Sequence, residues 1–461
     1  MAMESRWGAS RVVSTSTGQL QGKRLLVDAD LQRPVDVFLY PQSEDCLYLN
    51  VFASTWAPPK GLELGFPVMV FIHGGACVMG DARLTGDDEI CRNLDIIVVA
   101  IQYRVGYLGF WYTENGSIPS NLGMWDQAAA LQWVHDNIGA FGGNKDNVTL
   151  FGASAGSSSS DQLTLSPYTN KLIKRAICAG GSAFCPWAFN TKERALRECA
   201  AKVQQLKLKY TTDEELHSAL MSLPAEAFAE MPPLERVSGV AMVPLFDGDF
   251  FPGNSVEERR RKAPPCQLIY GVARLEAHML DFMGSITIQE HARKGMDFIS
   301  APRSNPGRGV KMLSNMMFDV GALQSAQHAA AKSDVFLFVW EYFNPKLTPW
   351  ENVKQTDATH GAVFPYTFGK GMFPSVFNSA DRMMTQYWTR VISNFAKYGD
   401  PNGSAMDPSA KLPVCWPSLA PDHTERHLVV DVIPFVKDSF LDGKPAVLRE
   451  ILGERKTILR P

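Results

Sequence analysis

The residues best suited to chemistry are a serine between two glycines, at Gly152-Ala153-Ser154-Ala155-Gly156. The run VTLFGA (148–153) has the apolar pattern of a buried strand, and DQLTL (161–165) can continue as a helix. A strand–Gly-x-Ser-x-Gly–helix arrangement is typical of a nucleophile elbow, a turn so tight that its flanking residues must be small. The alternative is an ordinary serine in a Ser-rich loop, and the pentapeptide by itself does not separate the two.

A serine hydroxyl becomes a good nucleophile only when a histidine accepts its proton and an acid orients that histidine. Acyl transfer also needs donors aimed at the developing oxyanion. The segment FIHGGACVMG (71–80) offers such donors, because the glycine-rich turn after a strand can direct backbone N–H groups at one point. The alternative is a plain strand-ending turn that contains His73. The position of Gly74-Gly75 upstream of the serine turn, as in esterases, favours the first interpretation.

Several strands and helices must position these segments. Continuous apolar runs predict strands buried on both faces; they lie at 68–75, 95–104, 147–153, 268–272, 335–342 and 427–433. Helical spacing, cap residues and a stop at Gly399 predict helices; these lie at 124–138, 191–206, 212–223 and 380–399. Strands that alternate with helices indicate an α/β fold with a mostly parallel sheet and helices on both faces.

Two polar segments fall outside this pattern. ERRRK (258–262) is interpreted as a solvated helix end after Ser255, with nuclear targeting as the alternative. APRSNPGRG (301–309) is interpreted as a surface loop within one domain, not as a linker between two domains.

Composition limits the classes of function. The 461 residues are 45% hydrophobic and carry a net charge of −3, so no broad basic field exists for nucleic acid. The eight cysteines form no CxxC pair, so we expect no zinc or thioredoxin-like site. No apolar run is long enough to span a bilayer, and the first ten residues lack the apolar core of a signal peptide. We therefore expect a cytoplasmic protein, or a secreted or endoplasmic-reticulum protein if the N-terminus is incomplete.

With these segments in order, the chain resembles the type-B carboxylesterases of the carboxylesterase/cholinesterase family, which have the α/β-hydrolase fold. The blocks that carry the resemblance span about residues 43 to 400 and are SEDCLYLNVF, VFIHGGACVMG, YRVGYLGF, NLGMWDQAAALQWVHDNIGAFGGNKDNVTLFGASAG, GGSAFCPWA, VPLFDGDFFP, YGVARLEA and THGAVFPYTFG. The resemblance implies a single domain over residues 1–461 and an enzyme without a cofactor or metal.

The resemblance also assigns roles, position by position. Ser154 matches the family's nucleophile, Glu276 in GVARLEA its acid, and His360 in THGA its base. The order Ser, acid, His along the chain agrees with that of α/β-hydrolases. The oxyanion donors map to the backbone N–H groups of Gly75, Ala76 and Ala155. Trp187 matches a residue on the acyl side of the pocket, with a core aromatic as the alternative, and Arg104 and Asp126 match a buried structural ion pair.

This chain departs from the family pattern in several places. Ala76 replaces a glycine of the oxyanion segment, and only glycine adopts positive φ freely. Ala153 stands where many relatives have a glutamate, which argues against choline esters. The family's Pro-rich loop after residue 40 is missing, so we expect Cys46 to lack its disulfide partner and the site to be more open. The segment between Glu276 and His360 is also shorter than in the family.

Two hypotheses follow. The first is a serine hydrolase whose substrate is a small-molecule carboxylic ester. It would cleave this ester to acid and alcohol through an acyl-enzyme intermediate. The second is a non-catalytic, neuroligin-like binding protein, or an esterase variant impaired by a splice or gene-model defect. The three retained triad positions favour the enzyme.

Overall fold

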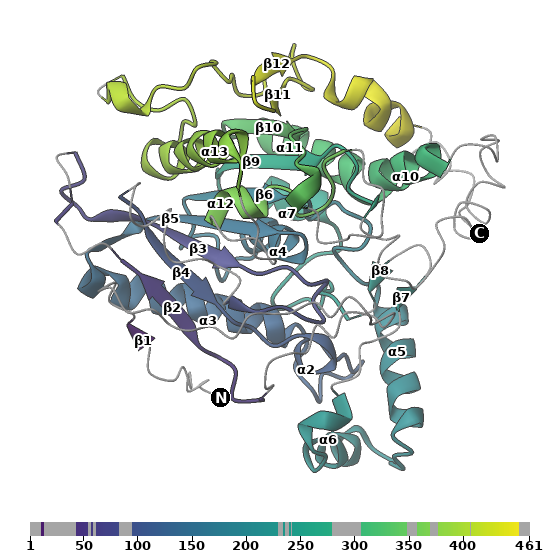
Figure 1. Cartoon of the computed structure of the whole chain (residues 1–461). Coiled ribbons are helices and arrows are strands. Elements are labelled where there is room, and N and C mark those ends of the chain that lie inside the picture. The colour runs from purple at the N-terminus through teal and green to yellow at the C-terminus, as the bar shows by residue number, and fades with distance from the viewer. Residues whose placement is uncertain are drawn as a thin grey trace.

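A twisted sheet runs through the centre of the molecule, with helices on both of its faces (Figure 1). The computed structural model describes residues 11–12, 43–53, 57–58, 61–82, 95–228, 234–235, 239–240, 242–278, 306–347, 357–368, 377–405 and 407–450. The expected missing loop after residue 40 lies outside these residues. Within them, no helix is long and apolar enough to cross a membrane.

The main sheet has 10 strands in the order β1-β2-β4-β3-β5-β6-β9-β10-β11-β12. Neighbouring strands are parallel except for the pairs β2–β4 and β11–β12. The strands are β1 (Arg11–Val12), β2 (Leu49–Phe52), β3 (Phe66–Ile72), β4 (Ile97–Ile101), β5 (Gly143–Ala153), β6 (Arg175–Ala179), β9 (Gln267–Ala273), β10 (Val335–Trp340), β11 (His427–Val430) and β12 (Phe435–Lys437). β7 (Leu234–Glu235) and β8 (Gly239–Val240) form a separate pair.

Helices connect these strands. They are α2 (Gly106–Phe110), α3 (Leu122–Asn137), α4 (Ala155–Leu163), α5 (Lys192–Gln205), α6 (Asp213–Met221), α7 (Val256–Lys262), α10 (Pro306–Ser314), α11 (Val320–Ala330), α12 (Phe364–Phe368) and α13 (Ser379–Tyr398). A π-helical turn, η4 (Asn315–Asp319), joins α10 to α11. Short 3-10 turns are η2 (Ile138–Phe141), η3 (Ala225–Phe228), η5 (Pro345–Leu347), η6 (Pro408–Ala410) and η7 (Phe440–Gly443).

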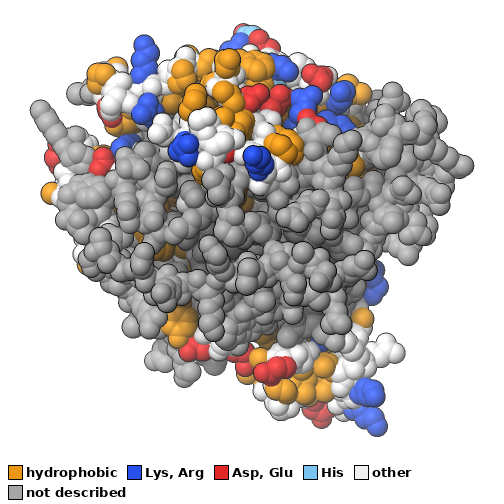
Figure 2. All heavy atoms as spheres, in the orientation of Figure 1, with side chains coloured by type: hydrophobic (Ala, Val, Ile, Leu, Met, Phe, Trp, Pro, Cys, Tyr) orange, Lys and Arg blue, Asp and Glu red, His pale blue; other side chains and the backbone are white. Residues whose placement is uncertain are grey.

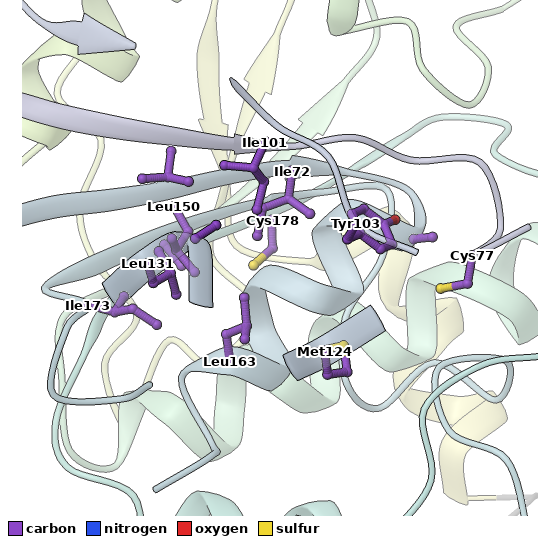
Figure 3. Packing of buried hydrophobic residues seen from close by; sticks show 14 of the residues in the cluster. Ile72, Cys77, Ile101, Tyr103, Met124, Leu131, Leu150, Leu163, Ile173 and Cys178 are labelled. Carbon is purple, nitrogen blue, oxygen red and sulfur yellow. The ribbon is translucent and has the colours of Figure 1, made fainter. Parts of the chain in front are cut away.

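Buried side chains of the central strands divide between two cores. In β3, Val68, Val70 and Ile72 belong to one cluster, whereas Met69 and Phe71 belong to the other. Successive side chains of a strand point to opposite faces, so the continuous apolar run fills both cores. Figure 3 shows the first core, where Leu131 of α3 and Leu163 of α4 pack near Leu150 and Cys178 of the sheet. α12 and α13 cover the other face.

Much of this architecture agrees with the sequence-based prediction. Each predicted strand and each predicted helix is present, with ends that differ by a few residues. The Thr191 hydroxyl accepts a hydrogen bond from the Arg194 amide, Thr212 forms a capping box, and Gly399 ends α13 with φ 78°. The pattern did not predict β6, α10 or α11. The described cysteines are all free, Cys46 among them.

Two interpretations of polar segments were wrong. The run at 258–262 belongs to α7 and does start after the Ser255 cap, but Arg259 and Arg260 are buried rather than solvated. The stretch at 301–309 is not all loop, because α10 begins at Pro306. Proline fits the first turn of a helix, where its missing N–H group costs nothing.

The predicted Arg104–Asp126 ion pair is present, but only Asp126 is buried and Arg104 is partly exposed. The guanidinium donates to both carboxylate oxygens at 2.7 Å, and the Arg104 amide donates to Asp126 at 3.0 Å. This two-pronged contact fixes the start of α2 and α3 against each other.

Hydrophobic side chains lie on the surface at the β11–β12 edge of the main sheet (Figure 2). Val432, Ile433 and Phe435 are exposed there.

Candidate active site

Ser154 lies at a sharp turn between β5 and α4, at the carboxyl end of the central strands. Its φ of 59° and ψ of −125° are strained for a residue with a side chain. The Ser154 amide donates to the Ala179 carbonyl at 3.0 Å, which ties the turn to β6. Such strained residues concentrate at functional sites. The structure thus has the strand–turn–helix geometry that a nucleophile elbow requires.

The glycines around Ser154 are required by close backbone approach. A Cβ atom on Gly152 would lie 2.0 Å from the Gly156 carbonyl oxygen, and one on Gly156 would lie 2.0 Å from the Ile72 carbonyl oxygen. Neither distance is tolerable, and backbone atoms cannot rotate away. The small residues of the pentapeptide therefore allow α4 to start directly against β3 and β5.

Glu276 and His360 form a buried pair. The His360 Nδ1 atom lies 2.6 Å from Oε2 of Glu276, and the Ala273 amide donates to Oε1 at 2.6 Å. The Glu276 residue is 1% exposed. A parallel bridge between Leu275 and Thr359 holds the two turns side by side. Because a carboxylate only accepts, Nδ1 must carry the proton, and Nε2 is left as the acceptor in the neutral ring.

Two glycines bring the pair and Ser154 to the same place. A Cβ atom on Gly180 would lie 3.2 Å from the His360 ring and 3.3 Å from Glu276, and one on Gly181 would lie 2.6 Å from the Ser154 carbonyl oxygen. The Gly180–Gly181 segment therefore runs between the serine turn and the histidine. The His360 Nε2 atom is buried and has no hydrogen-bond partner among the described residues.

The proposed oxyanion segment also meets the serine turn. A Cβ atom on Gly74 would lie 3.0 Å from Cβ of Ser154. Gly75, Ala76 and Cys77 follow with φ of 113°, 56° and 59°. Two successive residues with side chains in the left-handed region are strained. The departure noted at Ala76 thus falls at a position whose backbone favours glycine.

His73 stabilises the oxyanion segment through contacts of its buried ring. The residue is 1% exposed, its ring stacks on Tyr103 at 4.4 Å, and its Nδ1–H donates to the Gly74 carbonyl at 2.9 Å. Burial lowers the pKa of His73, so the ring is neutral. Tyr103 donates from its hydroxyl to the His73 carbonyl at 3.0 Å. His73 is therefore a structural residue of the strand-ending turn, and its hydrogen bond to the Gly74 carbonyl holds the adjacent glycines in place.

Trp187 and the η4 turn form a wall beside the histidine. The Trp187 indole N–H donates to the Met317 carbonyl at 2.7 Å, and its ring lies 5.6 Å from Phe318. Phe318 in turn lies 5.0 Å from the His360 ring. Trp187 is partly exposed, unlike a core aromatic. No pattern in the sequence pointed to Phe318, because a π-helical turn has no distinct residue pattern. Such turns are frequent at functional sites.

Asp319 is a second buried carboxyl near this wall. The residue is fully buried and neither carboxyl oxygen has a hydrogen-bond partner among the described residues. Burial raises the pKa of Asp319 to about 8, helped by the negative charge of Glu276 and opposed by Lys311. It is therefore largely protonated at neutral pH. The described residues contain no group of three side chains suited to a metal ion.

Comparisons with known proteins agree with this geometry. A model of the Carboxylesterase family matches residues 28–298 and 299–442. The chain is 30% identical over 453 residues to Esterase cest-33 of Caenorhabditis elegans, covering 90% of this chain and 80% of that protein. It is 31% identical over 446 residues to the Acylcarnitine hydrolase of Mus musculus, covering 88% and 74%, and 32% identical over 417 residues to the Bile salt-activated lipase of Bos taurus, covering 78% and 67%.

These relatives are named as an esterase, a hydrolase and a lipase, and they do not favour the non-catalytic hypothesis. The sheet, the serine turn and the family match lead to the same result. The chain belongs to the carboxylesterase family and is a hydrolase of carboxylic esters with the α/β-hydrolase fold.

Proposed function

We propose that ester hydrolysis in this protein proceeds through Ser154, His360 and Glu276. The Ser154 hydroxyl attacks the ester carbonyl carbon while His360 Nε2 accepts its proton. The tetrahedral intermediate collapses, the bond to the alcohol oxygen breaks, and His360 returns the proton to that oxygen. Water then attacks the acyl-enzyme and gives a proton to His360. When this second intermediate collapses, the bond to the Ser154 oxygen breaks, His360 returns the proton to that oxygen, and the acid leaves.

The observation that carries this proposal is the buried 2.6 Å contact between Glu276 and His360 beside a strained serine. Glu276 holds the tautomer in which Nε2 can accept a proton, and it stabilises the imidazolium that forms. The pair's burial keeps it away from competing water. No other described histidine contacts a buried carboxylate at the end of the central strands.

The oxyanion is proposed to bind to the backbone N–H groups of Gly75, Ala76 and Ala155. The amides of these residues donate to no other described backbone group. Ala155 is the first residue of α4, whose N-terminal N–H groups carry partial positive charge. Such preorganised donors stabilise charge that develops in the transition state.

The pocket is proposed to accept moderately apolar esters. Trp187 and Phe318 present an aromatic wall next to His360, and aromatic surface favours apolar groups. Ala153 argues against choline esters, as the sequence indicated. The relatives are named for different substrates, as acylcarnitine hydrolase and bile salt-activated lipase. Family membership therefore does not define the ester, and the residues that line the pocket of this chain must select it.

The test is burst and steady-state hydrolysis of p-nitrophenyl acetate and butyrate by the purified protein. Ser154→Ala should abolish the burst and leave turnover near background, with an unchanged circular dichroism spectrum. Ser158→Ala is the matched control, because it removes from the same helix a buried hydroxyl that has no hydrogen-bond partner among the described residues. A fluorophosphonate probe should label the wild type on the peptide that contains Ser154.

A burst that survives in Ser154→Ala would overturn the assignment of the nucleophile. A well-folded wild type that neither turns over these esters nor reacts with the probe would overturn the proposed mechanism as a whole.

A further inference from the structure

We propose that a cavity between α7 and α11 binds a compact oxyanion of the phosphate or phosphomonoester class. The two helices contact each other (Figure 1), and the cavity between them has a volume of about 260 Å³. Its lining residues are Arg260, Arg261, Gln327, His328, Ala331 and Lys332. None of them belongs to the ester-hydrolysing site, so this inference does not rest on the proposed function.

The lining carries positive charge. Three of the described lining residues are arginine or lysine, and none of them is acidic. Arg449, from the helical residues 444–450, donates to the Gln327 side chain and adds a fourth cation nearby. On a chain with a net charge of −3, such a local concentration of cations is not explained by overall composition. A concave cationic lining concentrates anions.

Arg260 is the fixed element of this site. It is 6% exposed and donates to Asp161, Tyr270 and Thr164, which hold its guanidinium in one orientation. Its Nε atom has no partner among the described residues. Burying an arginine is costly, and its planar fork suits oxyanions. The run ERRRK therefore contributes a buried, oriented cation to the cavity rather than only a solvated helix end.

Further donors are available in the lining. The Arg261 side chain has no hydrogen bond or ion pair to another described residue. The Lys332 ammonium donates to the carbonyls of Arg261 and Ala263, the latter at 3.2 Å, so one of its three hydrogens remains. His328 stacks on Phe184 at 4.9 Å, which fixes its ring at the cavity without engaging its nitrogens.

The size of the cavity favours a small ligand. Drug-sized molecules occupy pockets of roughly 300–1,000 Å³, and this one lies below that range. An apolar occupant would leave the Arg261 guanidinium and the remaining Lys332 hydrogen without acceptors among the described residues. A tetrahedral oxyanion accepts several charge-assisted hydrogen bonds within such a volume.

His328 provides a direct readout. Burial lowers the pKa of His328, and Arg260, Arg261 of α7 and Arg449 lower it further, while Glu257 of α7 opposes them. A bound dianion would counter these cations. Inorganic phosphate should therefore raise the pKa of His328 in an NMR titration, with the signal assigned by its loss in His328→Gln.

The affinity test is thermal unfolding of the full chain against inorganic phosphate, with chloride at matched ionic strength. Arg261→Gln should weaken phosphate binding at least tenfold. Lys262→Gln is the matched control: it removes the same charge from the next residue, an exposed lysine that pairs with Glu258 and does not line the cavity. Its affinity should stay within twofold of the wild type.

Two further measurements separate the sources of the phosphate group. Stabilisation by free phosphate or glycerol phosphate indicates a soluble ligand. Sedimentation with phosphatidic acid vesicles, lost in Arg261→Gln but kept in Lys262→Gln, indicates a lipid headgroup. Equal losses in both variants, or no binding of any of these probes, would overturn the site. Because no readout uses ester hydrolysis, this failure is distinct from failure of the proposed function.

Discussion

Nδ1 of His360 lies 2.6 Å from Oε2 of Glu276, although 84 residues separate the two in the chain. The Glu276 carboxylate also accepts from the Ala273 amide at the end of β9. The end of the strand therefore holds the carboxylate independently of the histidine. This makes Glu276 a fixed reference that selects one tautomer and one orientation of the ring.

Glu276→Gln tests this relationship. The amide is nearly isosteric, but its NH₂ group can face Nδ1 and favour the tautomer with the proton on Nε2. That nitrogen could then no longer accept the serine proton, and we expect kcat to fall about 10³–10⁴-fold with little change in KM. Steady-state hydrolysis of p-nitrophenyl butyrate by the variant and the wild type measures both kcat and KM. Glu258→Gln, on the surface of α7, should leave kcat unchanged; a loss below tenfold in Glu276→Gln would exclude the orienting role.

Ala76→Gly tests the strain in the oxyanion segment. Ala76 has φ 56°, where a side chain costs about 1–2 kcal/mol. Glycine removes this strain but adds chain entropy to the unfolded state, so we expect a net gain of about 0.5–1 kcal/mol in the free energy of unfolding. Ala129→Gly, inside α3, should instead lose about 1 kcal/mol. Urea titration measures the free energy of unfolding of both variants. A change of the same sign in Ala76→Gly and Ala129→Gly would contradict the strain at Ala76.

Gly181→Ala tests the close approach that joins the serine turn to the pocket wall. The new Cβ atom would lie 2.6 Å from the Ser154 carbonyl oxygen and 2.9 Å from the Trp187 ring. Either the turn or the indole must move, and we expect kcat/KM to fall about 100-fold, the loss that a misplacement of about 1 Å can cause. Gly139→Ala is the control, since its Cβ atom would meet nothing within 4 Å. Comparable activity in both variants would show that the segment can adjust.

Asp319→Asn tests the buried second carboxyl. The folded-state pKa of about 8 lies above the usual value of 3.8, so the folded protein binds this proton more tightly than the unfolded chain. The contribution of Asp319 to the free energy of unfolding is therefore highest below pH 4, where Asp319 is protonated in both states. It falls by up to about 1.4 kcal/mol per pH unit as the pH rises from about 4 toward 8.

Asparagine cannot ionise, so we expect Asp319→Asn to be more stable than the wild type at pH 8 and the difference to shrink toward pH 5. Thermal unfolding between pH 5 and pH 9 measures this. Asp422→Asn, at an exposed position, should show no such trend. A difference that does not vary with pH would mean that Asp319 has an ordinary pKa.

The sequence by itself determined most of the central strands, the serine turn of the site and the family. Runs such as 68–72 are apolar at every position, which is typical of a strand buried on both faces, so β3, β5 and β10 were predictable. The tight turn at Ser154 was predictable because such a turn demands small neighbours at fixed positions. Both inferences depend on residues adjacent in the chain.

Only the tertiary structure decided which distant residues meet. Glu276 and His360 have no local pattern, and a resemblance to relatives was needed to single them out. The sequence did not indicate that Phe318 packs on His360, that Arg260 is buried against Asp161, or that Asp319 lacks a partner. A charged side chain is normally exposed, and its burial depends on partners contributed by other helices and strands. The Glu276–His360 and Arg260–Asp161 contacts join residues 84 and 99 positions apart, and no short-range periodicity records them.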